Sequence, residues 1–336
     1  MTLSLFNLIS KMQTGILYGA TAYVIWGVLP MYWKQLGAVP AIQLAFHRIA
    51  WSFLVLLFII AVKGDFKAFR AAARGWRVFA IYTIASVAIL GNWVMYIWAV
   101  NAGYVLETSL GYFITPLVNV LVGVLVFKEK LRIWQWLAMG FAFAGVLVIA
   151  IAYAKFPWIA LTLGITFSIY SVAKKQAPLS ALHGLTVETG ILFVPAVVYL
   201  SVAEAMGDGG FLHVSTGHNL MLVGAGVVTV IPMVLFASAA QRIPLSLLGV
   251  LHYIAPSLMF VLGIAVYHEA FSTAKLIGFI LVWTGLAIYT VEGLAHQRAA
   301  KQALLTSPVE QTIEATSPAK DETTIDAEGD TPYARV

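Results

Sequence analysis

The chain contains no cysteine, and its charged residues are few. Without cysteine, neither disulfide bonds nor thiolate metal sites can form, and we expect no metal centre. Only 10% of the 336 residues are charged, whereas about 25% are charged in an ordinary soluble domain. So few ionised groups cannot cover a water-facing surface, and 61% of the residues are hydrophobic. The composition therefore predicts an all-α membrane protein whose main surroundings are the lipid bilayer.

Enzyme signatures are missing as well. The sequence has no G-x-S-x-G elbow, no H-E-x-x-H zinc helix and no G-x-x-x-x-G-K phosphate loop. We therefore expect neither an enzyme nor a cofactor, and no transport driven by a nucleotide. The net charge is +5, but the basic residues stand between apolar spans instead of forming one patch, so we expect no nucleic-acid partner.

Long apolar runs divide the chain into candidate transmembrane helices, each of which needs about 20 residues to cross the hydrocarbon core. Ten spans are predicted, at residues 15–36, 41–62, 76–100, 104–127, 131–152, 157–174, 183–202, 218–241, 244–267 and 272–293. The span at 157–174 is the weakest, because it is short and contains Thr162, Thr166 and Ser168.

The basic residues predict which way the spans run, because cytoplasmic flanks carry an excess of Lys and Arg. One set of flanks holds Lys11, the basic residues of 63–77 and 128–132, Lys174, Lys175, Arg242, Arg298 and Lys301. The opposite flanks hold Lys34, Arg48, Lys155 and Lys275. Both termini are therefore predicted to be cytoplasmic. Residues 1–14 are expected to form a short N-terminal segment, and residues 302–336 a polar, acidic and disordered tail.

The two halves of the chain repeat one pattern, P-x6-G-x5-E-x15-G, at a shift of 140 residues. The matched pairs are Pro116 with Pro256, Gly123 with Gly263, Glu129 with Glu269, and Gly145 with Gly285. Each half, 15–152 and 157–293, holds five predicted spans. Because five is odd, the second half enters the membrane from the opposite side. The sequence thus predicts ten helices in two inverted five-helix repeats, an arrangement typical of secondary transporters.

The repeated prolines, Pro116 and Pro256, lie about 12 residues into their spans, or about 18 Å along a helix. Both are therefore predicted near the bilayer centre. There a broken helix is tolerated where neighbouring groups or water satisfy the freed carbonyl. We interpret the two prolines as candidate hinges, and a fixed kink that helps packing is the alternative.

Several stretches of the sequence carry a family resemblance: "NWVMYIWAVNAGYVLETSLGYFITPLVNVLVGVLVFKEKLRIWQWLA", "AYVIWGVLPMYWK", "FHRIAWS" and "PLSLLGVLHYIAPSLMFVLG". They are similar to the RarD branch of the drug/metabolite transporter superfamily, with its two EamA-type halves. The resemblance covers residues 15 to about 293. It implies ten helices, a location in the bacterial cytoplasmic (inner) membrane and transport of a small molecule, with export favoured. It leaves the substrate open, and we also leave a homodimer open.

Arg48 is the sharpest candidate for a binding residue. It lies seven residues into its span, and ionisable groups at such depth usually face a partner or a wet cavity. His47 and Lys34 lie nearby on the same predicted side, and this basic cluster would suit an anionic or amphipathic substrate. The alternative is that Arg48 pairs with Glu107 and Lys34 is simply solvated.

His252 and Glu188 are the candidates for proton coupling. His252 is nearly as deep as Pro256, and an imidazole there could titrate during transport. A hydrogen bond from this ring to a neighbouring carbonyl is the alternative. Glu188 lies near the cytoplasmic end of its span, where an ion pair with Lys174 or Lys175 is the alternative to proton coupling.

Three further residues are predicted to line a substrate cavity. Trp26 and Tyr96 could bind a flat or cationic ligand by stacking and cation–π contact, although ordinary helix packing explains most such rings. Asn92 needs a partner for its buried amide, which is either another helix or the substrate. Together these residues favour a secondary transporter that works by alternating access. The alternatives are an importer or exchanger of the same fold, and an intramembrane lipid-modifying enzyme that uses His47, Arg48 and Glu188.

Overall fold

The computed structural model describes residues 2–102, 104–153, 156–266 and 272–305. Within these ranges the chain forms helices and no strands. The first half contains α1 (Thr2–Val28), α2 (Pro30–Gln35), α3 (Ala41–Val62), α4 (Phe66–Ala72), α5 (Trp76–Asn101), α6 (Val105–Leu125) and α7 (Ile133–Tyr153). The second half contains α8 (Trp158–Gln176), α9 (Ala181–Ala205), α10 (Thr216–Ala240), α11 (Leu245–His252), α12 (Ile254–Ala265) and α13 (Thr273–Leu305).

Eight helical segments of the described chain are long and apolar enough to cross a membrane, and a shorter apolar helix spans Leu110–Leu125. The predicted all-α membrane protein is therefore confirmed. The expected span at 157–174 corresponds to α8, which is not among the eight, because its threonines and its terminal Lys174 and Lys175 lower its hydropathy. A count of ten crossings stays a prediction.

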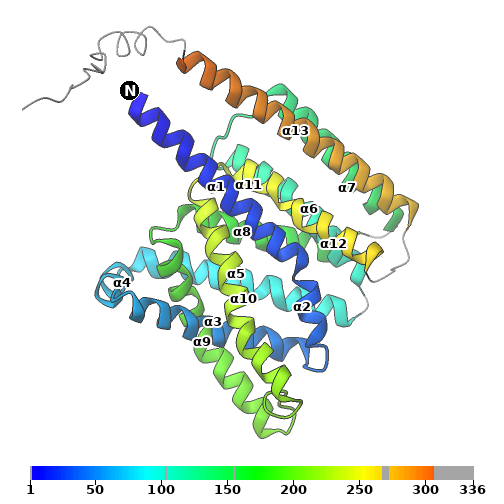
Figure 1. Cartoon of the computed structure of the whole chain (residues 1–336). Helices are drawn as coiled ribbons and strands as arrows, with labels where there is room; N and C mark the ends of the chain where they lie inside the picture. Colours follow the sequence, from blue (N-terminus) through cyan, green and yellow to red (C-terminus); the bar gives the residue numbers. More distant parts are fainter. Residues whose placement is uncertain (1, 103, 154–155, 267–271, 306–336) are drawn as a thin grey trace, which may run out of the picture.

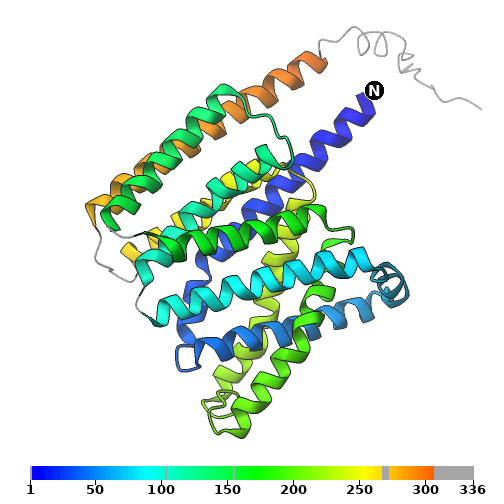
Figure 2. The ribbon, with the colours of Figure 1, turned by 180° about the vertical axis from the view of Figure 1, so that it is seen from behind.

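The helices pack into one bundle with an outer pair (Figures 1 and 2). α7 and α13 lie along one another at one edge and make their most extensive contacts with each other. α1 packs against α10, α11 and α12, whereas α8 packs against α5 and α6. α3 packs between α9 and α10. Helices from the two halves of the sequence are thus interleaved.

The outer pair is held by close backbone contact. A Cβ atom placed on Gly145 of α7 would lie 2.6 Å from the carbonyl oxygen of Gly278 in α13. A Cβ atom on Gly285 would lie 2.5 Å from the carbonyl oxygen of Ala138. No side chain fits at either glycine, so the two helices approach more closely than larger residues would allow.

Two predicted spans are broken in the structure. The span expected at 15–36 divides at Leu29 into α1 and α2, and the one at 244–267 divides at Tyr253 into α11 and α12. Each break lies just before a proline, Pro30 or Pro256, because proline has no N–H to bond the carbonyl four residues earlier. Pro116 instead lies inside the continuous helix α6. The two repeated prolines therefore have different local structures.

The chain ends also differ from expectation. Residues 2–14 continue the first span as part of α1, and α13 extends past residue 293 to Leu305. Good helix formers such as Ala, Gln and Lys follow residue 294, so the helix propagates. Most of the acidic tail expected at 302–336 lies outside the described residues. The start of α1 and the end of α13 point to the same end of the bundle as α4 (Figure 1).

Candidate substrate-binding cavity

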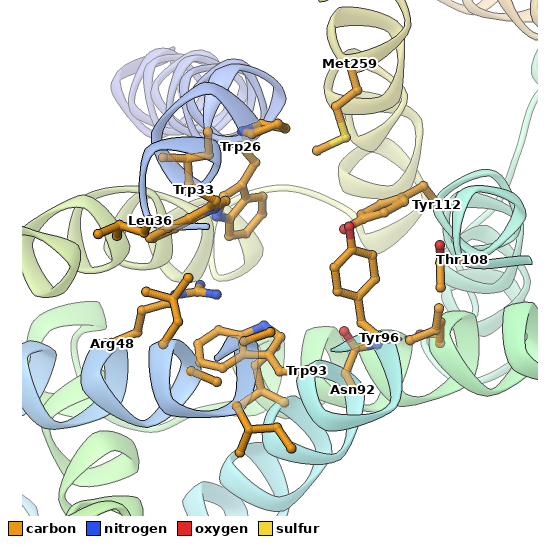
Figure 3. Close-up of a pocket in the computed structure, with 18 of the residues that line it drawn as sticks. Trp26, Trp33, Leu36, Arg48, Asn92, Trp93, Tyr96, Thr108, Tyr112 and Met259 are labelled. Atoms are coloured by element: carbon orange, nitrogen blue, oxygen red, sulfur yellow. Dashed lines mark hydrogen bonds between the residues drawn. The ribbon is translucent and has the colours of Figure 1, made fainter. Parts of the chain in front are cut away.

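A cavity of about 860 Å³ lies between the helices of the two halves (Figure 3). Its wall includes residues from α1, α2, α3, α5 and α6 of the first half and from α8 to α12 of the second. One end of the cavity reaches the loop at 36–40, between α2 and α3. The volume falls within the range of small-molecule sites. This cavity is therefore the candidate site, and α4, α7 and α13 take no part in its described lining.

Arg48 extends from α3 into this cavity. Its guanidinium carbon lies 4.7 Å from the ring centroid of Trp33 on α2 and 4.2 Å from that of Trp93 on α5. Its Nε donates a hydrogen bond to Thr229 Oγ1 on α10, at 3.1 Å. Three helices besides its own thus fix the position of this cation. The alternative partner proposed from sequence, Glu107, has a side chain outside those that the structure describes.

The structure brings five of the other predicted residues to the same wall: Trp26, Lys34, Asn92, Tyr96 and His252. Lys34 is exposed near the loop end of the cavity. Trp26 packs edge to face on Phe167, with ring centroids 6.1 Å apart. Tyr96 makes a similar contact with Tyr112, at 5.9 Å. The cavity wall is therefore mainly apolar and carries several aromatic rings.

Asn92 has found partners on another helix. Its amide nitrogen donates to the carbonyl oxygen of Leu163 and to Thr166 Oγ1, both at 2.9 Å. These bonds tie α5 to α8 at the cavity wall. Of the two partners expected from sequence, another helix or the substrate, the amide nitrogen takes the first.

His252 closes the inner part of the cavity at the end of α11. Its side chain is buried, and its ring lies 4.9 Å from that of Tyr23 and 5.2 Å from that of Phe167, centroid to centroid. Its Nδ1 is buried and has no hydrogen-bond partner among the described residues. The alternative to proton coupling, a hydrogen bond from this ring to a neighbouring carbonyl, is not found at Nδ1.

His47 and Glu188 do not line the main cavity. Successive residues of a helix point about 100° apart, so His47 faces away from Arg48 and packs against Phe211, with ring centroids 5.4 Å apart. Glu188 forms a buried ion pair with Lys174, and each side chain is at most 2% exposed. A separate pocket of about 20 Å³, enough for one water, is lined by both Arg48 and Glu188.

The end of the bundle opposite the 36–40 loop is tied together across the halves. Glu129 accepts hydrogen bonds from the backbone N–H groups of Leu245 and Ser246, at 2.6 and 2.9 Å. It thereby caps the start of α11, whose own N-cap residue provides no side-chain bond. Glu129 therefore ties the segment after α6 to the first turn of α11. Its repeat partner Glu269 lies outside the described residues.

Several residues of the cavity could not be identified as site residues from the sequence. Trp33 and Trp93 stand among many aromatic residues, and nothing in the sequence marks them as the pair that contacts Arg48. Thr229 is one hydroxyl among many in apolar spans, so its bond to Arg48 gives no sequence signal. Tyr112 is detectable only as the repeat counterpart of His252. No cluster of three or more potential metal ligands occurs among the described residues.

Comparisons with known proteins agree with this architecture. Residues 13–151 match the model of the EamA-like transporter family. Protein RarD from Streptomyces exfoliatus is 41% identical over 295 residues, which are 88% of this chain and 94% of the relative. The uncharacterized transporter YojE from Bacillus subtilis is 39% identical, with 87% of this chain and 98% of the relative covered.

A more distant relative and a solved structure are also similar to this chain. Protein RarD from Escherichia coli is 36% identical over 85% of this chain and 97% of the relative. A solved structure, described only as a crystal structure of a protein, superposes with a TM-score of 0.64. It covers 82% of this chain and 97% of its own at 23% identity, and so supports the fold alone. The RarD relatives, which match most of this chain at 36–41% identity, establish that the chain belongs to the RarD branch of the drug/metabolite transporter superfamily. The chain is therefore a multi-pass membrane transporter.

Proposed function

We propose that the protein is a secondary transporter that moves a small metabolite or drug across the bacterial cytoplasmic membrane by alternating access, in the direction of export. In this proposal ten transmembrane helices form two inverted five-helix repeats, and both termini are cytoplasmic. The observation that carries the proposal is the cavity of about 860 Å³ between the two halves. A passage shared by two inverted repeats can face either side of the membrane in turn.

The close contacts of α7 and α13 support the inverted repeat. The contact from Gly145 to the carbonyl of Gly278 has a reciprocal partner in the contact from Gly285 to the carbonyl of Ala138. A shift of 140 residues turns 145 into 285 and 138 into 278. The two contacts are therefore exchanged by the sequence repeat, as a twofold axis between the helices requires.

The packing order of the helices gives further support. In the proposed repeat α1 corresponds to α8, α5 to α10, and α6 to α11 and α12. α1 packs against α10, α11 and α12 of the second half, and α8 packs against α5 and α6 of the first. Exchanging the two halves leaves this set of neighbours unchanged, which is the behaviour of an internal twofold arrangement.

The proposed state is open to the outside. The cavity reaches the 36–40 loop, which lies on the side with few basic residues, while the opposite end is tied by Glu129 to the start of α11. Lys175 adds a hydrogen bond to the carbonyl oxygen of Ile243 at 2.7 Å in the same region. Alternating access then requires these cytoplasmic ties to break when the cavity opens inward.

The rival enzyme would need His47, Arg48 and Glu188 to converge on one reaction site. His47 packs against Phe211, away from the cavity, and Glu188 is engaged by Lys174. Arg48 and Glu188 share only a pocket of about 20 Å³, which His47 does not line. The three side chains therefore do not meet at a site that could hold a lipid substrate, which favours transport over an intramembrane transferase.

Two experiments test the proposal. Metabolite profiling of the medium from cells that lack or overproduce the protein identifies candidate substrates and their direction. Sealed vesicles that contain the protein should then accumulate such a substrate without forming a covalent product. A covalent product would favour the enzyme, and depletion of the metabolite from the medium by overproducing cells would favour import.

The inverted topology is tested separately. Because the chain has no natural cysteine, Lys130→Cys and Ala270→Cys each introduce a single thiol next to the repeated glutamates. A membrane-impermeant maleimide should label Ala270→Cys from outside intact cells, and Lys130→Cys only after permeabilisation. Labelling of both positions from the same side would exclude the inverted repeat.

A further inference from the structure

Arg48 lies in the cavity wall between two indole rings, and this setting points to a class of substrate. Trp33 and Trp93 lie on opposite sides of the guanidinium group, as Figure 3 shows. Cation–π contact stabilises the charge through both of its faces. A ligand can therefore approach the guanidinium group only along its edge.

One of the nitrogens along the edge of the guanidinium group already has a hydrogen-bond partner. Nε donates its hydrogen bond to Thr229 Oγ1 at 3.1 Å, which fixes the rotation of the group about its long axis. The two terminal nitrogens are left at the end that extends into the cavity (Figure 3). Two parallel N–H groups in one plane match the two oxygens of a carboxylate or a similar planar anion. Arg48 is therefore pre-oriented for end-on binding of such a group.

The charge of the wall agrees with this geometry. Lys34 adds a second cation near the 36–40 loop, and none of the described residues that line the cavity is Asp or Glu. A cationic ligand would lose its water and meet like charge, which disfavours binding. An anionic ligand would gain charge-assisted hydrogen bonds in the same place.

The wall across from Arg48 carries aromatic rings. Tyr96 and Tyr112 stand on that side in Figure 3, and Trp26 and Phe167, which also line the cavity, pack edge to face with each other. Aromatic surfaces of this kind favour stacking or edge contact with a planar apolar group. The cavity thus combines an anion-binding end with a surface for a flat body.

We propose that the cavity takes a monoanion: a small molecule with one planar anionic group, such as a carboxylate, on a flat and mostly apolar body. The anionic group binds the terminal nitrogens of Arg48, and the body lies against the aromatic wall. Thr229 acts as a positioning residue for Arg48. This inference rests on the proposed function, because the transported molecule must occupy this cavity.

Three probes that share one ring and differ in charge test the class: 4-phenylbutyrate, 4-phenylbutanol and 4-phenylbutylamine. Their binding to the full chain in lipid nanodiscs is measured by isothermal titration calorimetry. The acid should bind at least about tenfold more tightly than the alcohol, because charge-assisted hydrogen bonds are roughly twice as strong as neutral ones. The amine should bind most weakly. An amine or alcohol that binds as tightly as the acid overturns the inference, and so does the absence of binding by all three at millimolar concentration.

Variants then test whether Arg48 is the residue that causes the preference for the acid. Arg48→Gln should lower the affinity for the acid about tenfold or more, to that of the alcohol, and Thr229→Val should lower it by a smaller factor. Lys275→Gln, which removes a basic residue outside the cavity lining, is the matched control and should keep the preference. An acid preference that survives in a folded Arg48→Gln variant overturns the role of Arg48. Comparison of the three probes on the unmodified chain needs no variant to fold.

Flux of the same probes into sealed vesicles separates this inference from the proposed function. Selective binding of the acid without any flux would overturn transport and leave the ligand class standing. Flux that is selective for the amine or the alcohol would overturn the ligand class and leave transport standing.

Discussion

The carboxylate of Glu129 accepts a hydrogen bond from the backbone N–H of Leu245 across 116 positions of the chain, at 2.6 Å. The second oxygen accepts from Ser246 at 2.9 Å. Both donors belong to the first turn of α11, where N–H groups have no partner within the helix and the helix dipole favours negative charge. A loop residue of the first half thus caps a helix of the second half at the end opposite the 36–40 loop.

Removal of this cap should destabilise the protein. Glu129→Ala should lower the free energy of unfolding by about 1–2 kcal/mol, as the loss of helix caps does elsewhere. Glu129→Gln should cost less, because its amide oxygen can still accept one of the two bonds. Thermal unfolding of the purified protein, followed by tryptophan fluorescence, measures both variants. Lys130→Gln is the control, because Lys130 is exposed, and equal melting temperatures for all three variants would contradict the cap.

The glycines of the outer helix pair should be intolerant of side chains. Gly145→Ala and Gly285→Ala each place a Cβ within 2.6 Å of a backbone oxygen, so each should destabilise the fold by roughly 1–3 kcal/mol through overpacking. The two costs should be similar if the contacts are related by the repeat. Gly140→Ala on α7 is the control, because among the described residues its added Cβ would meet no atom within 4 Å beyond its chain neighbours and the backbone of its own helix. The melting temperatures of the three variants provide the test.

The buried pair of Lys174 and Glu188 should show strong coupling. Lys174→Met alone leaves a carboxylate buried at 2% exposure, and such a loss typically costs about 3–5 kcal/mol. Changing both residues, Lys174→Met with Glu188→Leu, removes the isolated charge and should recover most of that loss. A double-mutant cycle from denaturation curves measures the coupling. Additive costs in this cycle would contradict a pair that is stabilised mainly by mutual neutralisation.

His252 is tested as the coupling group for protons. Its buried Nδ1 has no partner among the described residues, and its ring lines the cavity. If the imidazole carries the coupling proton, His252→Gln should abolish substrate uptake that is driven by a pH gradient and spare exchange of substrate across the membrane. Proteoliposomes with and without an imposed gradient measure both. Glu188→Gln is compared in the same assay, and an unchanged gradient dependence in a folded His252→Gln variant would exclude this role for His252.

Arg48 should contribute more to transport than Lys34 does. Arg48 is contacted by Trp33, Trp93 and Thr229, whereas Lys34 is exposed near the loop. Arg48→Ala should therefore reduce flux by at least about tenfold, the scale of a lost charge-assisted contact, and Lys34→Ala by less. Near-normal flux in both variants would contradict the binding of an anionic group at this end of the cavity.

The breaks in the helices could be predicted only in part from the sequence. Pro116 and Pro256 are readable as a repeated pair, but α6 continues through Pro116, whereas Tyr253 separates α11 from α12 just before Pro256. Proline removes the same hydrogen bond at both positions. The local sequence pattern is the same at both prolines, so it does not show at which of them the helix is interrupted.

The sequence by itself determined the class of the protein, the position of its apolar spans and the family. Hydropathy and helix length depend on neighbouring residues, and these can be read along the chain. The depth of Arg48 could be read in the same way. Tertiary structure decided which side chains meet. Arg48 and His47 are adjacent in sequence but face different surroundings, because a helix turns by about 100° for each residue. The indoles of Trp33 and Trp93, the hydroxyl of Thr229 and the cap of Glu129 come from helices far apart in the chain, and only their packing brings them together.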